Sequence, residues 1–312
     1  MNPGQTGGLR RDGGMNKSFH LAQKIRFAHC DPAGVLYFPH VFDFVNTAVE
    51  DWFEAGLGMP FDAFHMEHGL GNPVVTTQCE FLRPCHFGEE LTLELAPTRI
   101  GHSSIELRIV ARVGNEERMR LNHRTAMISM DSFRPIAIPE ALRARAETFL
   151  VPRDNRSPGP ALPMWTGATP PNAFRSRQLV RFAHCDPGRI VYFARFFGMF
   201  DAALEDWFAE GLDCPWGGDL VGRRNLRTPS LVIGCEFRRA CRLGDRLDLD
   251  LWLTRLGRSS MRLALSGKVG AEERLRVAWT LCMVSRETWM SVPIPDDLRA
   301  RMEPFVASAN EK

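Results

Sequence analysis

The chain has 312 residues, of which 44% are hydrophobic and 24% charged, and its formal net charge is only +2. This composition is typical of a globular protein with one large or two ordinary domains. The near-neutral charge argues against bulk nucleic-acid binding, and no apolar run reaches the ~18 residues that a membrane span needs. We therefore expect neither a nucleic-acid partner nor a membrane partner.

The N-terminal residues 1–19 are rich in glycine and basic side chains but lack the apolar core of a signal peptide, so we expect a disordered leader. Without a secretory signal, the expected compartment is the cytoplasm, where the eight cysteines stay reduced. None of them forms a Cys-x-x-Cys motif. His29 and Cys30 are sequence neighbours and are not spaced like metal ligands, so we expect no metal site.

The main feature of the sequence is a stretch that occurs twice. Residues 26–32 and 181–187 both read Arg-Phe-Ala-His-Cys-Asp-Pro. The offset between the copies is 155 residues at Asp186 (186 − 31) and 156 residues at Pro229 (229 − 73). Each copy has the size of an ordinary domain, which indicates a duplicated domain and not a solenoid of short units.

Hydrophobic periodicity predicts the same elements in each copy. In the first copy, residues 21–29 alternate like a strand, and Asp31-Pro-Ala-Gly34 has turn chemistry. Over residues 37–55, apolar residues then recur at spacings of three and four residues, which predicts a long helix that stops at Gly56. A loop over 58–72 precedes four strand-like runs, at 74–82, 91–99, 104–113 and 118–130, and a short helix near 139–149. Hairpin-length turns between these runs predict antiparallel pairing, and the second copy repeats the order with its long helix near 192–210.

These elements predict an α+β chain in which each half packs one long helix against one antiparallel sheet. We expect one domain over 20–150 and a second over 176–306. The segment 151–175 contains six prolines, so we expect an extended and partly stiff linker. Residues 307–312 are expected to form a tail.

The candidate catalytic residues are Asp31 and Asp186. A lone Asp-Pro pair is usually a turn former or a helix cap. Here the same aspartate occurs twice in the same block, and a helix begins about six residues later. The first N–H groups of a helix can polarise a carbonyl oxygen or bind an anion. A carboxylate beside such amides suits acyl transfer.

At these residues the chain resembles the 4-hydroxybenzoyl-CoA thioesterase family of the hotdog fold. In the family pattern, Cys-Asp or Thr-Asp is followed by any two residues, a glycine, two hydrophobic residues, two aromatic residues and then the central helix. Residues 29–38 match it closely. The resemblance spans roughly 20–150 and 175–306, and it implies two fused hotdog domains.

The resemblance also implies an activity, which is the hydrolysis of an acyl-CoA, with an aryl-CoA such as 4-hydroxybenzoyl-CoA favoured. Asp31 and Asp186 would each attack the thioester carbonyl or activate water, and the backbone N–H groups of Phe38 and Phe193 would hold the oxyanion. CoA belongs to the substrate, so no cofactor is expected. Family members work as dimers, so the fusion implies an intrachain pseudo-dimer, and a further homo-oligomer stays open.

Two other functions are weighed against this one. A hotdog hydratase or dehydratase would resemble Asp-x-Asn-Pro-x-His, but both copies lack the Asn and the His. A non-catalytic acyl-CoA-binding module is the second alternative, and the aspartate retained in both copies argues against it.

The second copy departs from the family pattern, because Arg189 stands where the first copy has Gly34. The added bulk and charge predict unequal sites, with Asp31 carrying most of the turnover of a neutral acyl-CoA. The histidines that precede the Cys-Asp pair could contact the substrate, or they could lie at the end of a strand and form a hydrogen bond with the backbone. The tyrosines could likewise contact the substrate or belong to the core. The candidate substrate-binding residues are His29, His184, Tyr37, Tyr192, Arg189, Phe61 and Trp216.

Two turns are candidates for binding the CoA phosphates. Residues 99–103 and 255–259 bring arginine, glycine and hydroxyl groups together between two strands, and arginine forks suit phosphate. A solvated hairpin is the alternative for any one of these residues. The candidate CoA-binding residues are Arg99, His102, Ser103, Arg255, Arg258 and Ser259.

Overall fold

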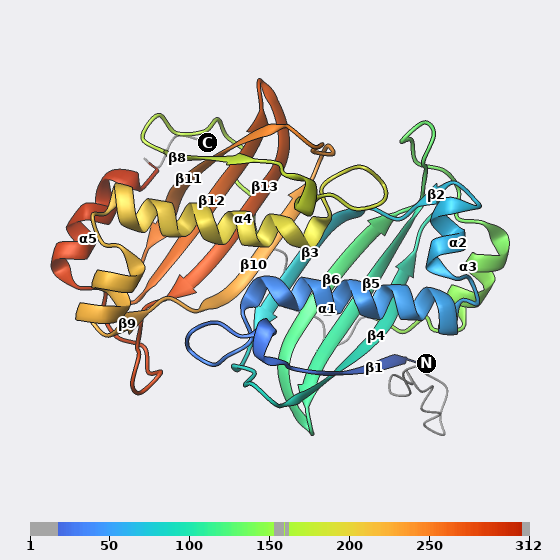
Figure 1. The fold of residues 1–312 in the computed structure, drawn as a ribbon, viewed down its shortest axis with the longest axis horizontal. Helices are drawn as coiled ribbons and strands as arrows, with labels where there is room; N and C mark the ends of the chain where they lie inside the picture. The colour runs from blue at the N-terminus through green and yellow to red at the C-terminus, as the bar shows by residue number, and fades with distance from the viewer. Residues whose placement is uncertain (1–17, 153–158, 160–161, 308–312) are drawn as a thin grey trace. The chain divides into compact units, whose positions relative to one another are not determined.

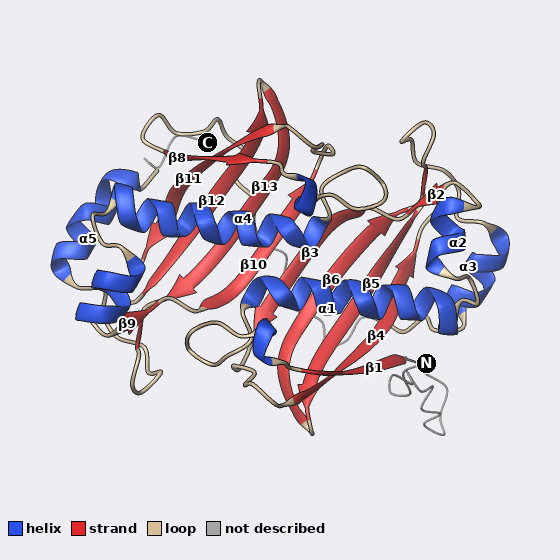
Figure 2. Ribbon diagram, viewed as in Figure 1, coloured by secondary structure: helices blue, strands red, loops and turns tan. Residues whose placement is uncertain are grey.

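Each half of the chain folds as one long helix across one face of an antiparallel sheet (Figures 1 and 2). The computed structural model describes residues 18–152, 159 and 162–307. The chain divides into two units, residues 1–160 and 161–312. Most of the predicted leader, part of the predicted linker and most of the predicted tail lie outside the described residues.

In unit 1 the chain order of elements follows the predicted order. The elements are β1 (Phe19–Lys24), η1 (Phe27–His29), α1 (Phe38–Asp51), η2 (Trp52–Gly56), α2 (Phe61–Met66), β2 (Leu70–Gly71), β3 (Val74–Phe81), β4 (Glu90–Ile100), β5 (Ser104–Val113), β6 (Glu116–Ala126), β7 (Ile128–Ser129) and α3 (Glu140–Glu147). The main strands run in the order β1-β4-β5-β6-β3, and every neighbouring pair is antiparallel. Strands β2 and β7 form a separate small pair.

Unit 2 repeats this arrangement. Its elements are β8 (Phe174–Leu179), η3 (Phe182–His184), α4 (Phe193–Asp206), η4 (Trp207–Gly211), η5 (Trp216–Arg223), β9 (Leu226–Arg227), β10 (Ser230–Phe237), β11 (Arg246–Leu256), β12 (Ser260–Val269), β13 (Glu272–Cys282), β14 (Val284–Ser285), α5 (Asp296–Met302) and η6 (Glu303–Phe305). The main strands run in the order β8-β11-β12-β13-β10, again antiparallel, and β9 pairs with β14.

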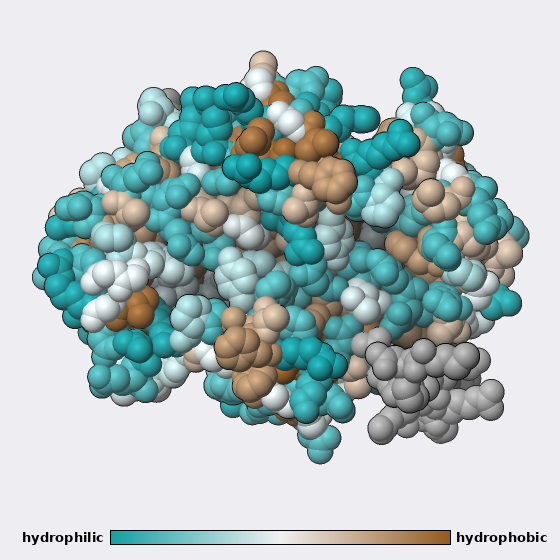
Figure 3. All heavy atoms as spheres, in the orientation of Figure 1, coloured by the Kyte–Doolittle hydropathy of each residue, from teal (hydrophilic) through white to brown (hydrophobic). Residues whose placement is uncertain are grey.

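The core of each unit lies between the long helix and the sheet. In unit 1, Phe42, Val45 and Trp52 of the helical segment and Leu91 and Leu95 of β4 are fully buried. Alternate residues of a strand share a face, so the leucines of β4 form one apolar stripe. On the face of the molecule in Figure 3, hydrophilic side chains predominate and hydrophobic ones form small separate patches. No helix in the described ranges has the length and apolarity to cross a membrane.

The glycine that ends each long helix is required by packing. A Cβ on Gly56 would lie 2.5 Å from Cδ1 of the buried Trp52, and one on Gly211 would lie 2.7 Å from the same atom of Trp207. Both distances are shorter than a real carbon contact. The helices therefore end where an indole covers the backbone, in a wider π-helical turn.

Three boundary predictions were wrong. The strand predicted at 21–29 is β1 only as far as Lys24, and residues 27–29 form a 3-10 turn, because the chain leaves the edge of β4 there. The strand also starts at Phe19, inside the predicted leader. The predicted loop 58–72 contains α2 and β2, because Phe64 packs its ring 5.1 Å from that of Phe53.

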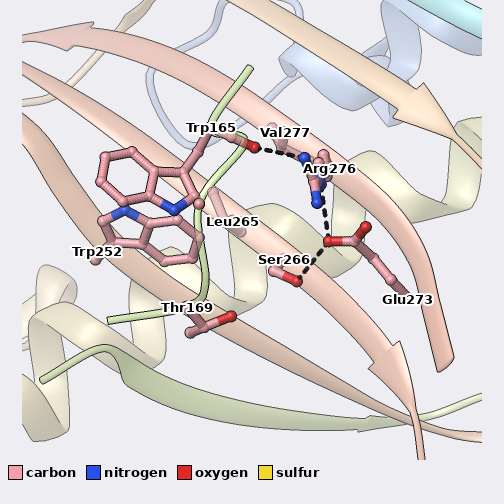
Figure 4. Close-up of a pocket in the computed structure, with 9 residues that line it drawn as sticks. Trp165, Thr169, Trp252, Leu265, Ser266, Glu273, Arg276 and Val277 are labelled. Atoms are coloured by element: carbon pink, nitrogen blue, oxygen red, sulfur yellow. Dashed lines mark hydrogen bonds and ion pairs between the residues drawn. The ribbon is translucent and has the colours of Figure 1, made fainter. Parts of the chain in front are cut away.

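The outer faces of the two sheets differ. In unit 1 this face carries a buried ion pair, in which Arg108 Nη2 donates to Glu94 Oε1 at 2.9 Å. In unit 2 the equivalent carboxylate is Asp250, which accepts a hydrogen bond from Arg175 Nε at 2.6 Å, and a tryptophan of the predicted linker also lies on the sheet, with the Trp165 ring 5.8 Å from that of Trp252 (Figure 4). Arg276 Nη1 donates to the carbonyl oxygen of Trp165 at 2.8 Å. The cavity between them measures about 10 Å³, which holds at most one water molecule, so it is not a substrate site.

Candidate active site

Asp31 lies in a tight loop between the 3-10 turn η1 and helix α1. Its N–H donates to Val35 O at 2.9 Å, and the N–H of Tyr37 donates to His29 O at 2.9 Å. The N–H of Gly34 donates to Asp31 O at 2.9 Å, and Gly34 has a φ of +75°. The two sides of the loop therefore pair like a short hairpin and place Asp31 just before the helix.

The second copy builds the same loop around Asp186. Its N–H donates to Ile190 O at 3.0 Å, and the N–H of Tyr192 donates to His184 O at 2.9 Å. The N–H of Arg189 donates to Asp186 O at 2.9 Å, and Arg189 has a φ of +63°. Arginine therefore adopts the left-handed conformation of the glycine, although that region is unfavourable for any residue with a Cβ.

The carboxylate of Asp31 has a structural role in its own loop. Its Oδ1 accepts hydrogen bonds from the N–H groups of Ala33 at 2.7 Å and Val35 at 3.4 Å. This is the turn-forming behaviour expected of an Asp-Pro pair. The turn holds the side chain in place, so the structural role is compatible with the predicted catalytic one.

Asp186 has one buried carboxylate oxygen that accepts no hydrogen bond in the described part of the chain. Burial raises the pKa of Asp186 above its usual range, and the backbone N–H groups of Ile190 and Gly188 oppose that shift. The buried oxygen is Oδ1. Such an oxygen keeps a lone pair for attack on a carbonyl carbon or for removing a proton from water.

The neighbouring cysteine is a poor competitor as nucleophile. Burial raises the pKa of the Cys30 thiol, and the negative charge of Asp31 raises it further. Burial and Asp186 act in the same way on Cys185. Only the thiolate is strongly nucleophilic, so the carboxylates are the better candidates in both loops.

Phe38 and Phe193 are the first residues of the long helices. The residue after Phe38 is a proline, which carries no N–H, and the N–H of His40 donates to Tyr37 O at 2.9 Å. The amide of Phe38 is therefore the helix-terminal donor nearest to the Asp31 loop, where the helix dipole is positive. Its role as the oxyanion donor stays a prediction.

His29 and His184 are tied to the backbone. The Nδ1 atom of His29 accepts the N–H of Arg26 at 3.1 Å, and that of His184 accepts the N–H of Arg181 at 3.1 Å. Burial lowers the pKa of both imidazoles. An accepting Nδ1 places the proton of a neutral ring on Nε2. The geometry therefore agrees with the alternative in which these histidines bind the backbone. The Nε2–H group is the donor that remains for a substrate.

Sequence reasoning missed a difference between the loops. In unit 1, His40 Nδ1 lies 3.1 Å from Asp43 Oδ2, and the His40 ring lies 5.9 Å from the ring of His29. The equivalent positions in unit 2 are Arg195 and Gly198. The signal was present, because the second copy replaces both members of this His–Asp pair near the first helix turn.

The two tyrosines stand at the helix starts, as N-cap residues of α1 and α4. The Tyr37 ring lies 5.7 Å from that of His40, and the guanidinium of Arg195 lies 5.4 Å from the centre of the Tyr192 ring. Each tyrosine is therefore beside the residue that differs most between the copies. A substrate contact for either one stays a prediction.

Phe61 and Trp216 lie beyond the other ends of the long helices. Phe61 packs its ring 5.3 Å from that of Phe53, and Trp216 packs 5.9 Å from Phe208. The helical segment 38–56 is about 28 Å long, at ~1.5 Å per residue. Within its own unit, neither ring is near the aspartate, and a role in lining the acyl pocket stays a prediction.

The two predicted CoA-binding turns are also distant from the aspartate of their own unit. Strand β4 begins beside the Asp31 loop and ends at the turn 99–103, about 33 Å away at ~3.3 Å per residue. Arg143 Nη2 donates to Gly101 O at 2.6 Å and ties this turn to α3. The equivalent arginine of α5 is Arg299, which donates to Gly257 O. Phosphate binding by these turns stays a prediction.

No group of three or more His, Cys, Asp or Glu side chains is placed to hold a metal ion in the described part of the chain. The eight cysteines are all free thiols.

Curated relatives share parts of the chain. A 1,4-dihydroxy-2-naphthoyl-CoA hydrolase from Synechococcus sp. (strain WH7803) is 29% identical over 140 residues, which are 43% of this chain and 91% of the relative. A 4-hydroxybenzoyl-CoA thioesterase from Pseudomonas sp. (strain CBS-3) is 32% identical over 82 residues, which are 26% of this chain and 57% of the relative.

A solved structure matches nearly the whole chain. The 12:0-ACP thioesterase from Umbellularia californica superposes with a TM-score of 0.68 at 14% identity, over 85% of this chain and 93% of that one. This likeness concerns the fold, which is that of two hotdog units in one chain. The family model described as the thioesterase-like superfamily matches residues 25–146 and again residues 180–302. The chain therefore belongs to the thioesterase-like superfamily, whose model matches once in each half.

Proposed function

We propose that this protein is an acyl-CoA thioesterase whose substrate is an aryl-CoA and whose catalytic carboxylates are Asp31 and Asp186. The observation that carries the proposal is the loop built twice, in which a held aspartate directly precedes the N-terminus of a long helix. Membership of the superfamily supports thioester hydrolysis, and the names of the relatives above support an aromatic acyl group.

The first proposed step is an attack on the thioester. A carboxylate oxygen of Asp31 or Asp186 adds to the carbonyl carbon, and the C–S bond breaks as CoA leaves with its electron pair as a thiolate. A mixed anhydride then joins the acyl group to the aspartate, and water hydrolyses it to the free acid and the aspartate. In the alternative route the carboxylate takes a proton from water, which attacks the same carbon.

Charge develops on the carbonyl oxygen in both routes. The amides of Phe38 and Phe193 lie at the positive ends of α1 and α4, where a fixed N–H stabilises such an oxyanion. Removing one oxyanion donor typically slows acyl transfer by about 10²–10³-fold. A thiolate is a good leaving group, so the site needs no strong acid beside the sulfur.

The test is a thioesterase assay on the purified full chain with a panel of aryl-CoA and alkyl-CoA thioesters. The release of free CoA thiol is measured over time. We expect the aryl-CoA thioesters to be hydrolysed fastest. A double variant, D31N with D186N, serves as the inactive reference. Hydrolysis of no thioester, or hydrolysis that the double variant retains, would overturn the proposal.

Rapid-quench mass spectrometry separates the two routes. An acyl group attached to a peptide that contains Asp31 or Asp186 indicates the nucleophilic route, and its absence during the pre-steady state indicates the general-base route. The expected pseudo-dimer within the chain, any further homo-oligomer and the cytoplasmic location stay predictions.

A further inference from the structure

Arg189 occupies a glycine's position without a structural benefit. The loops around Gly34 and Arg189 share the backbone hydrogen bonds that close them and have similar φ angles of +75° and +63°, although Gly34 O also accepts the N–H of Phe87 at 3.2 Å. A left-handed conformation is unfavourable for a residue with a Cβ. A Cβ added to Gly34 would meet nothing within 4 Å, and the Arg189 side chain is exposed. The arginine therefore gains no packing that offsets its strain.

Arg189 does not neutralise the catalytic carboxylate of its own loop. Arg189 is not among the groups that shift the pKa of Asp186. The groups that act on the Asp186 carboxyl are its burial and the backbone N–H groups of its own turn. The arginine thus leaves Asp186 able to react and presents a cation at the rim of the same loop.

The whole stretch around Asp186 is more positive than its counterpart. Residues 26–43 contain one arginine and two aspartates, a formal charge of −1. Residues 181–198 contain three arginines and one aspartate, a formal charge of +2. This difference in charge occurs between two loops of similar backbone conformation. It therefore changes which ligand the loop favours and leaves the fold of the loop as it is.

We infer that the Asp186 loop is specific for a thioester whose acyl group carries a carboxylate, with Arg189 as the residue that binds it, whereas the Asp31 loop takes a neutral acyl group. This inference rests on the proposed thioesterase function. Arginine binds carboxylates through two parallel N–H donors. The phosphates of CoA offer the same chemistry, but they are common to the substrates of both loops and do not explain a cation in only one.

The test uses two thioesters that differ by one carboxylate, benzoyl-CoA and 4-carboxybenzoyl-CoA. The variant D31N reports on the Asp186 loop and D186N on the Asp31 loop. For each variant, the measured quantity is kcat/KM for 4-carboxybenzoyl-CoA divided by kcat/KM for benzoyl-CoA. We expect this ratio to be at least about 10-fold higher in D31N than in D186N, which is the effect of one charge-assisted hydrogen bond. Adding R189G to D31N should bring the ratio down to that of D186N, mainly through KM, and R189K should restore part of it.

Two controls make the result specific. R189G introduces the residue of the other copy and relieves strain, so loss of folding is not expected. R286A removes an exposed arginine of the β14 hairpin and should leave the ratio in D31N unchanged. Equal ratios in D31N and D186N, or a ratio that R189G does not change, would overturn the inference while hydrolysis of benzoyl-CoA would still uphold the thioesterase proposal.

A third arm separates the acyl carboxylate from the nucleotide phosphate. Both thioesters are also prepared with 3′-dephospho-CoA. If Arg189 binds the acyl carboxylate, the effect of R189G persists with these substrates. If R189G weakens both thioesters equally and the effect vanishes without the 3′-phosphate, the cation belongs to CoA binding and the inference about the acyl group is wrong.

Discussion

The Nδ1 atom of His123 lies 3.2 Å from the hydroxyl oxygen of Thr77, and both side chains are buried in unit 1. The equivalent position in unit 2 is Trp279, whose Nε1–H donates to Ser230 Oγ at 2.9 Å. Burial lowers the pKa of His123 to about 4. One half of the chain therefore contains an interior proton-binding group that the other half lacks.

His123 should make the protein less stable in acid. An unfolded histidine titrates near ~6.5, so between pH 6.5 and 4 the unfolded state binds more protons than the folded one. The neutral, buried His123 costs no stability above pH 6.5. As the pH falls, the free energy of unfolding decreases, and the loss reaches about 3 kcal/mol at pH 4. Urea unfolding of the full chain at pH 7 and pH 4.5 measures this loss, which should be smaller in H123Q.

The readout is the change of stability with pH, because H123Q also alters packing at both pH values. The same substitution at the exposed His68 controls for the loss of an imidazole. If H123Q and the parent lose the same stability between the two pH values, His123 is not the responsible group.

Asp31→Asn and Asp186→Asn should each keep the fold, because asparagine has the same size and a similar turn preference. General base catalysis alone usually contributes ~10²–10⁴-fold, so each change should reduce turnover at its own loop by at least that factor. With a neutral aryl-CoA, we expect D31N to remove most of the total turnover. Steady-state thiol release measures this, and equal losses of about one half would indicate two equivalent sites.

The Asp186 loop should lose activity at a higher pH than an ordinary aspartate would. Its carboxylate must be ionised to attack or to take a proton, and burial raises its pKa above the usual ~3.9. As the pH falls through that raised pKa, the reactive form disappears. The acid limb of kcat/KM in D31N, measured from pH 3.5 to 7, gives the midpoint. A midpoint at or below ~3.9 contradicts the prediction.

His29 should act mainly through its bond to the backbone of Arg26. An asparagine offers a carbonyl oxygen near the position of Nδ1, so H29N should still accept the hydrogen bond from the N–H of Arg26. H29A lacks this acceptor and should lose about 1 kcal/mol of stability. We therefore expect H29N to hydrolyse an aryl-CoA within a few-fold of the parent rate. A much larger fall in kcat with unchanged stability would instead assign the Nε2–H of His29 to the substrate.

Local patterns in the sequence were sufficient for much of the fold. The repeat, the long helix before Gly56 and the strand runs follow from periodicity and turn residues, and each is present. The same holds for the position of Asp31 in a turn before a helix. Helix α2 was missed, because two phenylalanines, Phe61 and Phe64, that pack on Phe53 at the end of another helix leave no periodic signal in so short a segment.

Only the tertiary structure decided which residues meet. The β4 hairpin carries the turn 99–103 to the far end of the sheet from Asp31, which spacing along the chain does not reveal. The approach of His29 to His40 needs the loop to fold back onto α1. The sequence identified Arg189 as a departure from Gly34, but the structure decided that the loop accepts it. The equivalent position of unit 1 has room for a side chain, because a Cβ added to Gly34 would meet no atom, and Arg189 itself is exposed, so only its backbone bears the strain.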